Sequence, residues 1–235
     1  MRTPQAKFSV RDATMHDPRP NTPATWSPPN PLPSRLETAR LVIRFYEESD
    51  APALFTAIDQ SRRSLLPWLP WAEKENTTVD AALASIRRFA EARHNYAAPE
   101  NNAVFGFVMG IFDKGTGALV GGTGFNRIEF GTSDAETGYW VVAARRGQGI
   151  ATESTAALLS AGFTPQQRGG WGFRRIRILA SAANAASCSV PRKLGLREEC
   201  RFVQHRWVPG FGWTDTLGWA ALDGEWDTVN HHPRP

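Results

Sequence analysis

The 235-residue chain has few cysteines and no long apolar run, and both absences narrow its class. Cys188 and Cys200 are too few and too close together for a disulfide framework or a metal site, so we expect no bound metal and a reducing, cytoplasmic location. The lack of about eighteen consecutive apolar residues excludes a membrane-spanning helix. No apolar segment follows Arg2 and Lys7, so we expect neither a secretory signal nor a membrane partner.

The chain also lacks the glycine motifs of two large nucleotide-binding classes. It contains no Gly-Lys dipeptide, which excludes a Walker A loop, and no Gly-x-Gly-x-x-Gly spacing. ATP and dinucleotides are therefore not expected as ligands. The formal charge of +4 is modest and no basic stripe with interleaved aromatics occurs, so specific nucleic-acid binding is not expected either.

Proline is unevenly distributed along the chain. Eight of the seventeen prolines lie in residues 1–34, where there is almost no apolar run to offset the entropy lost on ordering. We therefore predict that residues 1–34 are a disordered or draped arm, whose deletion shifts the melting temperature by no more than about a degree or two. Residues 35–227 should form one domain, and residues 228–235 a short tail.

The domain is expected to alternate strands and helices, with no repeat. Period-two and continuous apolar segments predict strands at residues 41–45, 105–111, 118–125, 136–142, 175–181, 202–208 and 214–222. Helical spacing predicts helices from Ser49 or Asp50 to 58 and at 78–94, 150–163 and 185–194, the last capped by Asn184 and ended by Gly195.

One strand-to-helix junction has the composition of an anion site. It reads Arg146-Gly147-Gln148-Gly149-Ile150-Ala151. Successive backbone N–H groups and the positive end of the following helix would form a cradle for a phosphate or pyrophosphate, which the glycines allow to approach closely. The alternative is an ordinary turn whose glycines only relieve strain. The residues of this loop alone leave both interpretations open.

The order of several motifs resembles one family. Arg146-x-x-Gly149-x-Ala151, after Ala135-Glu136-Thr137-Gly138-Tyr139-Trp140, is similar to the acyl-CoA pyrophosphate motif and central strand of the GNAT superfamily of N-acetyltransferases. Asn184-Ala185-Ala186-Ser187 with Lys193-Leu194-Gly195-Leu196 resembles its RimJ/RimL-type branch, which acetylates ribosomal-protein N termini. Leu36 to Leu41 and Asp223 to Trp226 match that branch at both ends, so the resemblance covers about residues 35–227. Two departures are Leu196, where Phe is usual, and Pro191, which should kink or shorten its helix.

The resemblance implies an α/β (mixed α+β) fold: a bent, mostly antiparallel mixed sheet with helices on both faces and a splayed central strand pair. In that pair the strand ending near Val142 parts from the strand beginning near Ile176. Acetyl-CoA would place its pantetheine in that gap, against main-chain groups, and its pyrophosphate on the glycine loop. The implied cofactor-binding residues are Trp140, Val141, Val142, Arg146, Gly147, Gln148, Gly149, Ile150, Ala151 and Asn184.

Acetyl transfer to an amine needs a base and a donor for the leaving thiolate. Glu136 is our candidate base, because on a strand it shares a face with Gly138 and Trp140; alternatively it is a solvated carboxylate. Ser187 is the candidate donor or sulfur ligand by family analogy; alternatively its hydroxyl only bonds to the helix backbone. We expect direct transfer and not a covalent intermediate on Cys188, because no histidine lies near it in sequence.

The resemblance implies that the acceptor is the N-terminal α-amine of a protein or peptide. Small amines, amino-acid conjugates and antibiotics stay open, as do a non-catalytic CoA- or peptide-binding module and a nucleic-acid role for the basic arm. Four aromatics could wall the acceptor pocket, or could merely pack a loop: Trp68, Trp71, Phe211 and Trp213. We expect a monomer or homodimer, and expect His231 and His232 to be solvated.

Overall fold

The computed structural model describes residues 25–95 and 106–233, so predictions for residues 1–24 and for Phe105 lie outside it. Its α-helices are α1 (Ala51–Leu65), α2 (Val79–Asn95), α3 (Ile150–Phe163) and α4 (Ala185–Lys193). Its strands are β1 (Arg35–Glu37), β2 (Leu41–Phe45), β3 (Phe107–Asp113), β4 (Leu119–Glu129), β5 (Asp134–Val141), β6 (Arg175–Ser181), β7 (Arg197–Val208), β8 (Gly212–Leu222), β9 (Trp226–Asp227) and β10 (His232–Pro233). Within these residues, no helix combines the length and apolar character that crossing a membrane would need.

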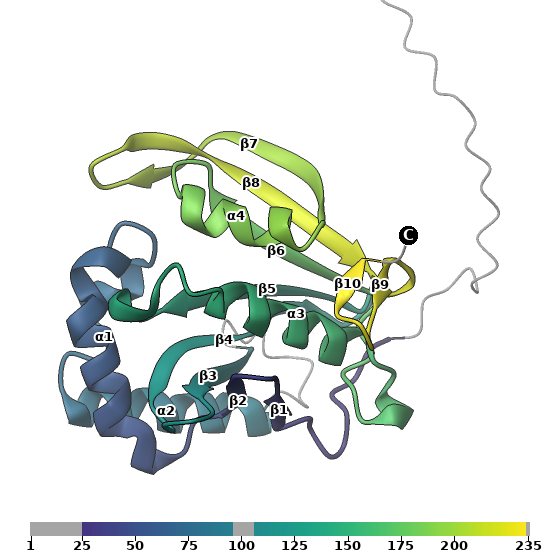
Figure 1. Cartoon of the computed structure of the whole chain (residues 1–235), viewed down its shortest axis with the longest axis horizontal. Helices are drawn as coiled ribbons and strands as arrows, with labels where there is room; N and C mark the ends of the chain where they lie inside the picture. Colours follow the sequence, from purple (N-terminus) through teal and green to yellow (C-terminus); the bar gives the residue numbers. More distant parts are fainter. Residues whose placement is uncertain (1–24, 96–105, 234–235) are drawn as a thin grey trace, which may run out of the picture.

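Eight strands form one sheet in the order β1-β2-β3-β4-β5-β6-β8-β7. Neighbouring strands are antiparallel, except for the parallel pair β5 and β6. Figure 1 shows α3 and α4 over one face of this sheet, with α1 and α2 packed on the other side. The predicted fold class, a mostly antiparallel mixed sheet with helices on both faces, is confirmed.

Each face of the sheet has its own apolar cluster, because successive side chains of a strand point to opposite faces. The larger cluster lies under α3 and α4 and contains Ala135 and Leu158, both fully buried. The smaller cluster lies under α1 and α2 and contains Tyr46, Leu54 and Ile86. The α3/α4 side and the α1/α2 side of the domain are therefore packed by different residues.

Residues 25–34, which the sequence analysis placed in the arm, pack against the domain. Trp26 is 4% exposed; its indole Nε1 donates to Trp171 O at 2.7 Å, and its ring stacks on Phe173 with centroids 4.8 Å apart. Its main-chain N–H donates to Phe130 O at 2.7 Å. The expectation that removing the arm costs no core is therefore wrong for this segment, because a lone tryptophan can anchor a chain that lacks any apolar run.

Two other boundaries differ from the sequence predictions. Helix α1 continues from Ile58 to Leu65, because Ser61 and Leu65 extend its buried face. The predicted tail returns to the domain as β10, which pairs with β9. His231 is exposed, as expected, and its Nδ1 also lies 2.6 Å from Ser160 Oγ.

Candidate active site

The central parallel strands separate soon after they begin to pair. β5 and β6 are paired over three positions, the last joining Glu136 to Arg177. Beyond that point β5 continues to Val141 along β4, and β6 continues to Ser181 along β8, without pairing to each other. The sheet is thus continuous at one end and open at the other, as predicted for the splayed central pair.

The pairing of β5 determines which main-chain groups border this gap. Val142 N–H donates to Val120 O at 3.0 Å, across to β4. Because bonding direction alternates along an antiparallel strand, Trp140 also directs its main-chain groups to β4, whereas Tyr139 and Val141 direct theirs to the gap. The sequence analysis assigned pantetheine contacts to Trp140, Val141 and Val142. The main-chain groups of Trp140 and Val142 are directed to β4, whereas those of Val141 and Tyr139 make no hydrogen bond to β4.

The glycine loop ends in a helix start with unpaired donors. Gly147 and Gly149 have φ angles of +75° and +80°, in the left-handed region that favours glycine. From Gly147 to Thr152, no main-chain N–H donates to another described residue. These donors and the positive end of α3 suit a phosphate group, so the residues present fit the pyrophosphate of acetyl-CoA.

The opening motif, Leu36 to Leu41, supports this loop from the side. Arg40 Nη1 donates to Gln148 O at 3.0 Å, and its Nε donates to Glu153 Oε2 at 2.7 Å. Thr38 Oγ1 donates to Glu153 Oε1 at 2.5 Å. Burial acts to raise the pKa of Glu153, but the hydrogen bonds from Thr38 and Arg40 outweigh it and the pKa is lowered. The motif therefore holds a charged carboxylate in the first turn of α3.

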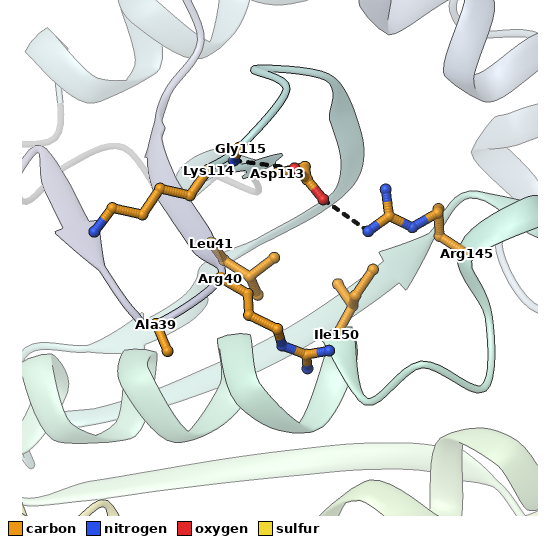
Figure 2. A pocket seen from close by; sticks show the side chains of 8 residues that line it. All are labelled: Ala39, Arg40, Leu41, Asp113, Lys114, Gly115, Arg145 and Ile150. Atoms are coloured by element: carbon orange, nitrogen blue, oxygen red, sulfur yellow. Dashed lines mark hydrogen bonds and ion pairs between the residues drawn. The ribbon is translucent and has the colours of Figure 1, made fainter.

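A cavity of about 390 Å³ lies between this motif and the turn after β3. Figure 2 shows Arg40 close to Ile150 at the start of α3, and the pair formed by Asp113 and Arg145. Arg145 Nη2 lies 2.7 Å from Asp113 Oδ2, and Arg145 Nε donates to Gln148 Oε1 at 2.8 Å. The first of these bonds is the main reason that the pKa of Asp113 falls to about 2. Arg40 and Arg145 are thus already paired with carboxylates, and their hydrogen bonds to Gln148 fix the conformation of the glycine loop.

The start of α4 meets β5 across the gap. Asn184 Oδ1 accepts a hydrogen bond from Ser187 N at 3.1 Å, which confirms its predicted role as the cap. Pro191 lies inside α4 and has no N–H to donate to the carbonyl of Ser187, four residues earlier. Tyr139 Oη donates to that carbonyl instead, at 2.8 Å, and lies 3.4 Å from Ser187 Oγ. The proline thus leaves a helix carbonyl free for a side chain of β5.

Sequence reasoning missed Tyr139. Burial raises the pKa of Tyr139 to about 12, so its phenol is protonated and can donate at neutral pH. Its partner is 48 residues away, and no local spacing rule connects the two positions. The available signal was Pro191, which always leaves one carbonyl without its helix donor.

Glu136 lies where the two central strands part. Its carboxylate is 3.4 Å from Arg177 Nε, and Arg177 also pairs with Asp134 at 3.6 Å. Its cross-strand neighbour is Asn126, which lines a cavity on the α1/α2 face. Glu136 is therefore both part of a row of ion pairs and a neighbour of that cavity, and its role as a base stays a prediction.

That second cavity has a volume of about 320 Å³ and reaches the gap through Gly138 and Tyr139. Its walls come from Tyr46 just after β2, from β3, β4 and β5, from α1 and α2, and from the connection between the two helices. Trp71 and Trp140 both line it, with ring centroids 6.3 Å apart. It therefore opens onto the gap from the face opposite α3 and α4.

The four predicted acceptor aromatics are not brought together. Trp71 lines the cavity, whereas Trp68 packs on Phe211 outside its lining, with centroids 5.1 Å apart. Trp213 is 60% exposed and contacts Trp207 on the β7–β8 hairpin. The presence of aromatic residues in the sequence could not show which of them line a cavity and which lie on the surface of the β7–β8 hairpin.

Cys188 has the character of a packed thiol. Its Sγ donates to Ser181 O at 3.3 Å, and burial raises the pKa of the thiol, which disfavours the nucleophilic thiolate. In the portion of the chain that is described, no three His, Cys, Asp or Glu side chains gather as metal ligands.

Two parallel strands that part, beside a helix whose first main-chain N–H groups have no partner, form the arrangement expected of an acetyl-CoA-dependent N-acetyltransferase. Residues 40–197 match the acetyltransferase (GNAT) domain family, and the chain belongs to it. It is 27% identical over 187 residues to "Putative ribosomal N-acetyltransferase YdaF" of Bacillus subtilis (strain 168), covering 80% of this chain and 93% of that protein. The resemblance to the RimJ/RimL-type branch is thus confirmed at the level of relatives.

Two solved structures share the fold. One is RimJ of Mycobacterium smegmatis in complex with a CoA disulfide, with a TM-score of 0.69 at 24% identity over 87% of this chain and 95% of that one. The other is RimL, the ribosomal L7/L12 α-N-protein acetyltransferase, in complex with coenzyme A, with a TM-score of 0.68 at 23% identity over 80% and 98%. The chain is an acetyl-CoA-dependent GNAT N-acetyltransferase, and acetyl-CoA is its cosubstrate.

Proposed function

We propose that the enzyme acetylates the N-terminal α-amine of a protein or peptide. The observation that carries this proposal is the meeting of two compartments at the gap between β5 and β6: an anion cradle on the α3/α4 side and a cavity on the α1/α2 side. Two substrates that enter from opposite faces can meet there without passing each other. The name of the relative YdaF, a ribosomal N-acetyltransferase, supports a protein acceptor.

On the cofactor side, acetyl-CoA supplies an activated acetyl thioester. The N–H groups from Gly147 to Thr152 would hold its pyrophosphate, and the gap-facing main-chain groups of Tyr139 and Val141 would pair with the pantetheine amides. One of these gap-facing N–H groups can polarise the thioester carbonyl, as a fixed donor does in any oxyanion site.

On the acceptor side, the amine must lose a proton to react. Glu136, acting directly or through water, takes that proton as the amine nitrogen bonds to the carbonyl carbon and the carbon–sulfur bond breaks. Ser187 Oγ gives a proton to the departing sulfur and regains one from solvent. Tyr139 Oη, 3.4 Å from Ser187 Oγ, holds the hydroxyl in place. Both assignments follow the motif resemblance and the position of each residue beside the gap.

The setting of the reaction follows from the same proposal. Ribosomal proteins are synthesised in the cytoplasm, and two free cysteines fit a reducing compartment, so we place the enzyme there. We expect a monomer or homodimer, with no nucleic-acid or membrane partner.

Thiol release tests the proposed function. The protein is incubated with acetyl-CoA and a panel of peptides with free N termini, matched peptides with blocked N termini, polyamines and free amino acids. We expect thiol release that requires a free N-terminal amine. Release only with polyamines or antibiotics would assign a small-molecule acceptor, and no release with any amine would favour a non-catalytic module.

A further inference from the structure

The second cavity has a carboxylate on one wall. Glu75 lines the cavity, and its carboxylate pairs with Arg88 through Oε2 at 2.7 Å. The adjacent Asn76 is 3% exposed, and its Oδ1 has no hydrogen-bond partner among the described residues. That oxygen has almost no accessible surface, so a ligand in the cavity would contact Glu75 and not the Asn76 oxygen.

This wall is held firmly in place. Arg62 of α1 donates to the carbonyl of Asn76 at 2.8 Å and to that of Glu75 at 3.2 Å, and it also contacts the carbonyl of Ala72. Asn76 has a φ of +54°, a left-handed conformation that asparagine tolerates better than most residues. Arg62 does not line the cavity, so it acts by positioning the loop that carries Glu75.

A different wall of the cavity contains hydrogen-bond donors. Tyr46 Oη and Trp140 Nε1 lie 3.0 and 2.3 Å from the point where a Cβ on Gly122 would stand, so the missing side chain gives both groups their room. Neither group makes a hydrogen bond to any other residue that the structure describes. Burial raises the pKa of Tyr46, so its phenol stays protonated.

The rest of the lining is mainly apolar, with Thr123 and Asn126 as polar members, and the cavity is small. Leu54, Ile58, Phe89 and Val108 contribute side chains to it. A volume of about 320 Å³ lies at the lower end of the range for ligand sites, roughly 300–1,000 Å³. The cavity suits one residue of an acceptor, not a long segment.

We propose that this cavity binds an α-aminoacyl group with an apolar side chain: Glu75 accepts from its amine, and Tyr46 and Trp140 donate to the carbonyl oxygen beside that amine. The inference rests on the proposed function and extends it from an N-terminal amine to the groups that recognise one. A simple alkylamine has no carbonyl, so it leaves two buried donors without a partner, and sites built this way reject such analogues strongly.

Paired ligands test the role of the carbonyl. Leucinamide and 3-methylbutylamine share an amine and a side chain, and only leucinamide has the carbonyl. Their binding is measured by calorimetry with CoA present, which blocks turnover. We expect leucinamide to bind about tenfold or more tightly, and Tyr46→Phe to weaken leucinamide about three- to tenfold while leaving 3-methylbutylamine unchanged. Equal binding of the two ligands would overturn the proposal. A leucyl tripeptide that binds better than leucinamide identifies a peptide source; equal binding identifies a free amino-acid derivative.

A second comparison tests the acceptor wall. Glu75→Gln should raise the KM for leucinamide about tenfold or more with little change in kcat, whereas Glu73→Gln, an exposed neighbour on the same loop, should change neither. An unchanged KM in Glu75→Gln would overturn the assignment. Failure of the inference is distinguishable from failure of the proposed function: the first leaves thiol release intact but indifferent to the carbonyl, whereas the second abolishes thiol release with every amine.

Discussion

The two faces of the sheet would bind their substrates through different parts of the chain. On the α3/α4 side the free groups are main-chain donors, contributed by one loop and one strand edge that are close in sequence. On the α1/α2 side they are side chains from Tyr46 just after β2, from β5 and from the connection between α1 and α2. Main-chain sites tolerate most substitutions, whereas side-chain sites change with every one. Such an enzyme can keep one cosubstrate and vary its acceptor.

The largest expected effect concerns the packing of the cofactor face. Trp26→Ala removes a buried indole, its stacking on Phe173 and its bond to Trp171 O, so the free energy of unfolding should fall by about 3 to 5 kcal/mol. Trp213→Ala, at an exposed position, is the matched control and should cost less than about 0.5 kcal/mol. Urea denaturation measures both. Equal losses would mean that residues 25–34 do not belong to the core.

The next effect concerns the acceptor face. Glu136→Gln keeps the shape of the side chain and removes its basicity, so turnover should fall about 10²-fold at neutral pH. Activity should partly recover toward about pH 9, because more of an α-amine with a pKa of about 7.7 to 8.0 is then neutral. Turnover profiles from about pH 6 to 9.5 provide the measurement. Full activity of Glu136→Gln across this pH range would show that Glu136 has only a structural role, in its ion pair with Arg177.

A third change tests the main-chain cradle. Gly149→Val places a β-branched residue at φ +80°, with its Cβ 3.3 Å from Arg40 Nη2, and distorts the loop at a cost of about 2 kcal/mol. Acetyl-CoA affinity should fall roughly 30-fold, because every 1.4 kcal/mol is about tenfold. Gln148→Ala removes only exposed side-chain contacts and should change affinity less than about threefold. Calorimetry measures the acetyl-CoA affinity of both variants. Two small, equal effects would show that this loop does not bind the pyrophosphate.

A smaller effect is expected at the leaving group. A CoA thiolate, with a pKa near that of cysteine at about 8.5, leaves tolerably without help, so Ser187→Ala should lower turnover only about tenfold. No recovery at high pH is expected, in contrast to Glu136→Gln, and acetyl-CoA binding should be unchanged. A loss of binding would show that the hydroxyl holds the cofactor.

The smallest effect concerns the contact that Pro191 permits. Tyr139→Phe removes the hydroxyl bond to Ser187 O and should cost about 1 kcal/mol of unfolding free energy. In a Pro191→Ala background, residue 191 regains an N–H that can donate to the same carbonyl, so Tyr139→Phe should cost less. A double-mutant cycle should therefore show coupling of about 0.5 to 1 kcal/mol. Additive effects would show that Tyr139 and Pro191 are not energetically coupled.

Sequence reasoning predicted the parts of the site that are local. The glycine loop and the Asn184 cap follow from residues within a few positions of one another, whereas the splayed pair was predicted from the family resemblance. Trp26 was missed because its indole partner is 145 residues away, and no periodicity marks a single anchoring side chain. Glu75 and Tyr46 were missed because a cavity between a loop and the sheet depends on tertiary packing. Trp140 and Val142 were assigned to the cofactor because strand register with β4 cannot be derived from β5 alone.

Amide hydrogen exchange with and without CoA tests the central claim most directly, because that claim concerns identified main-chain N–H groups. CoA should slow exchange at Tyr139, at Val141 and from Gly147 to Thr152, because the main-chain N–H groups of these residues have no hydrogen-bond partner among the described residues. Val142, already bonded to Val120, should change little and is the internal control. Protection confined to the α1–α2 connection, with none at Val141 or in the glycine loop, would contradict the account.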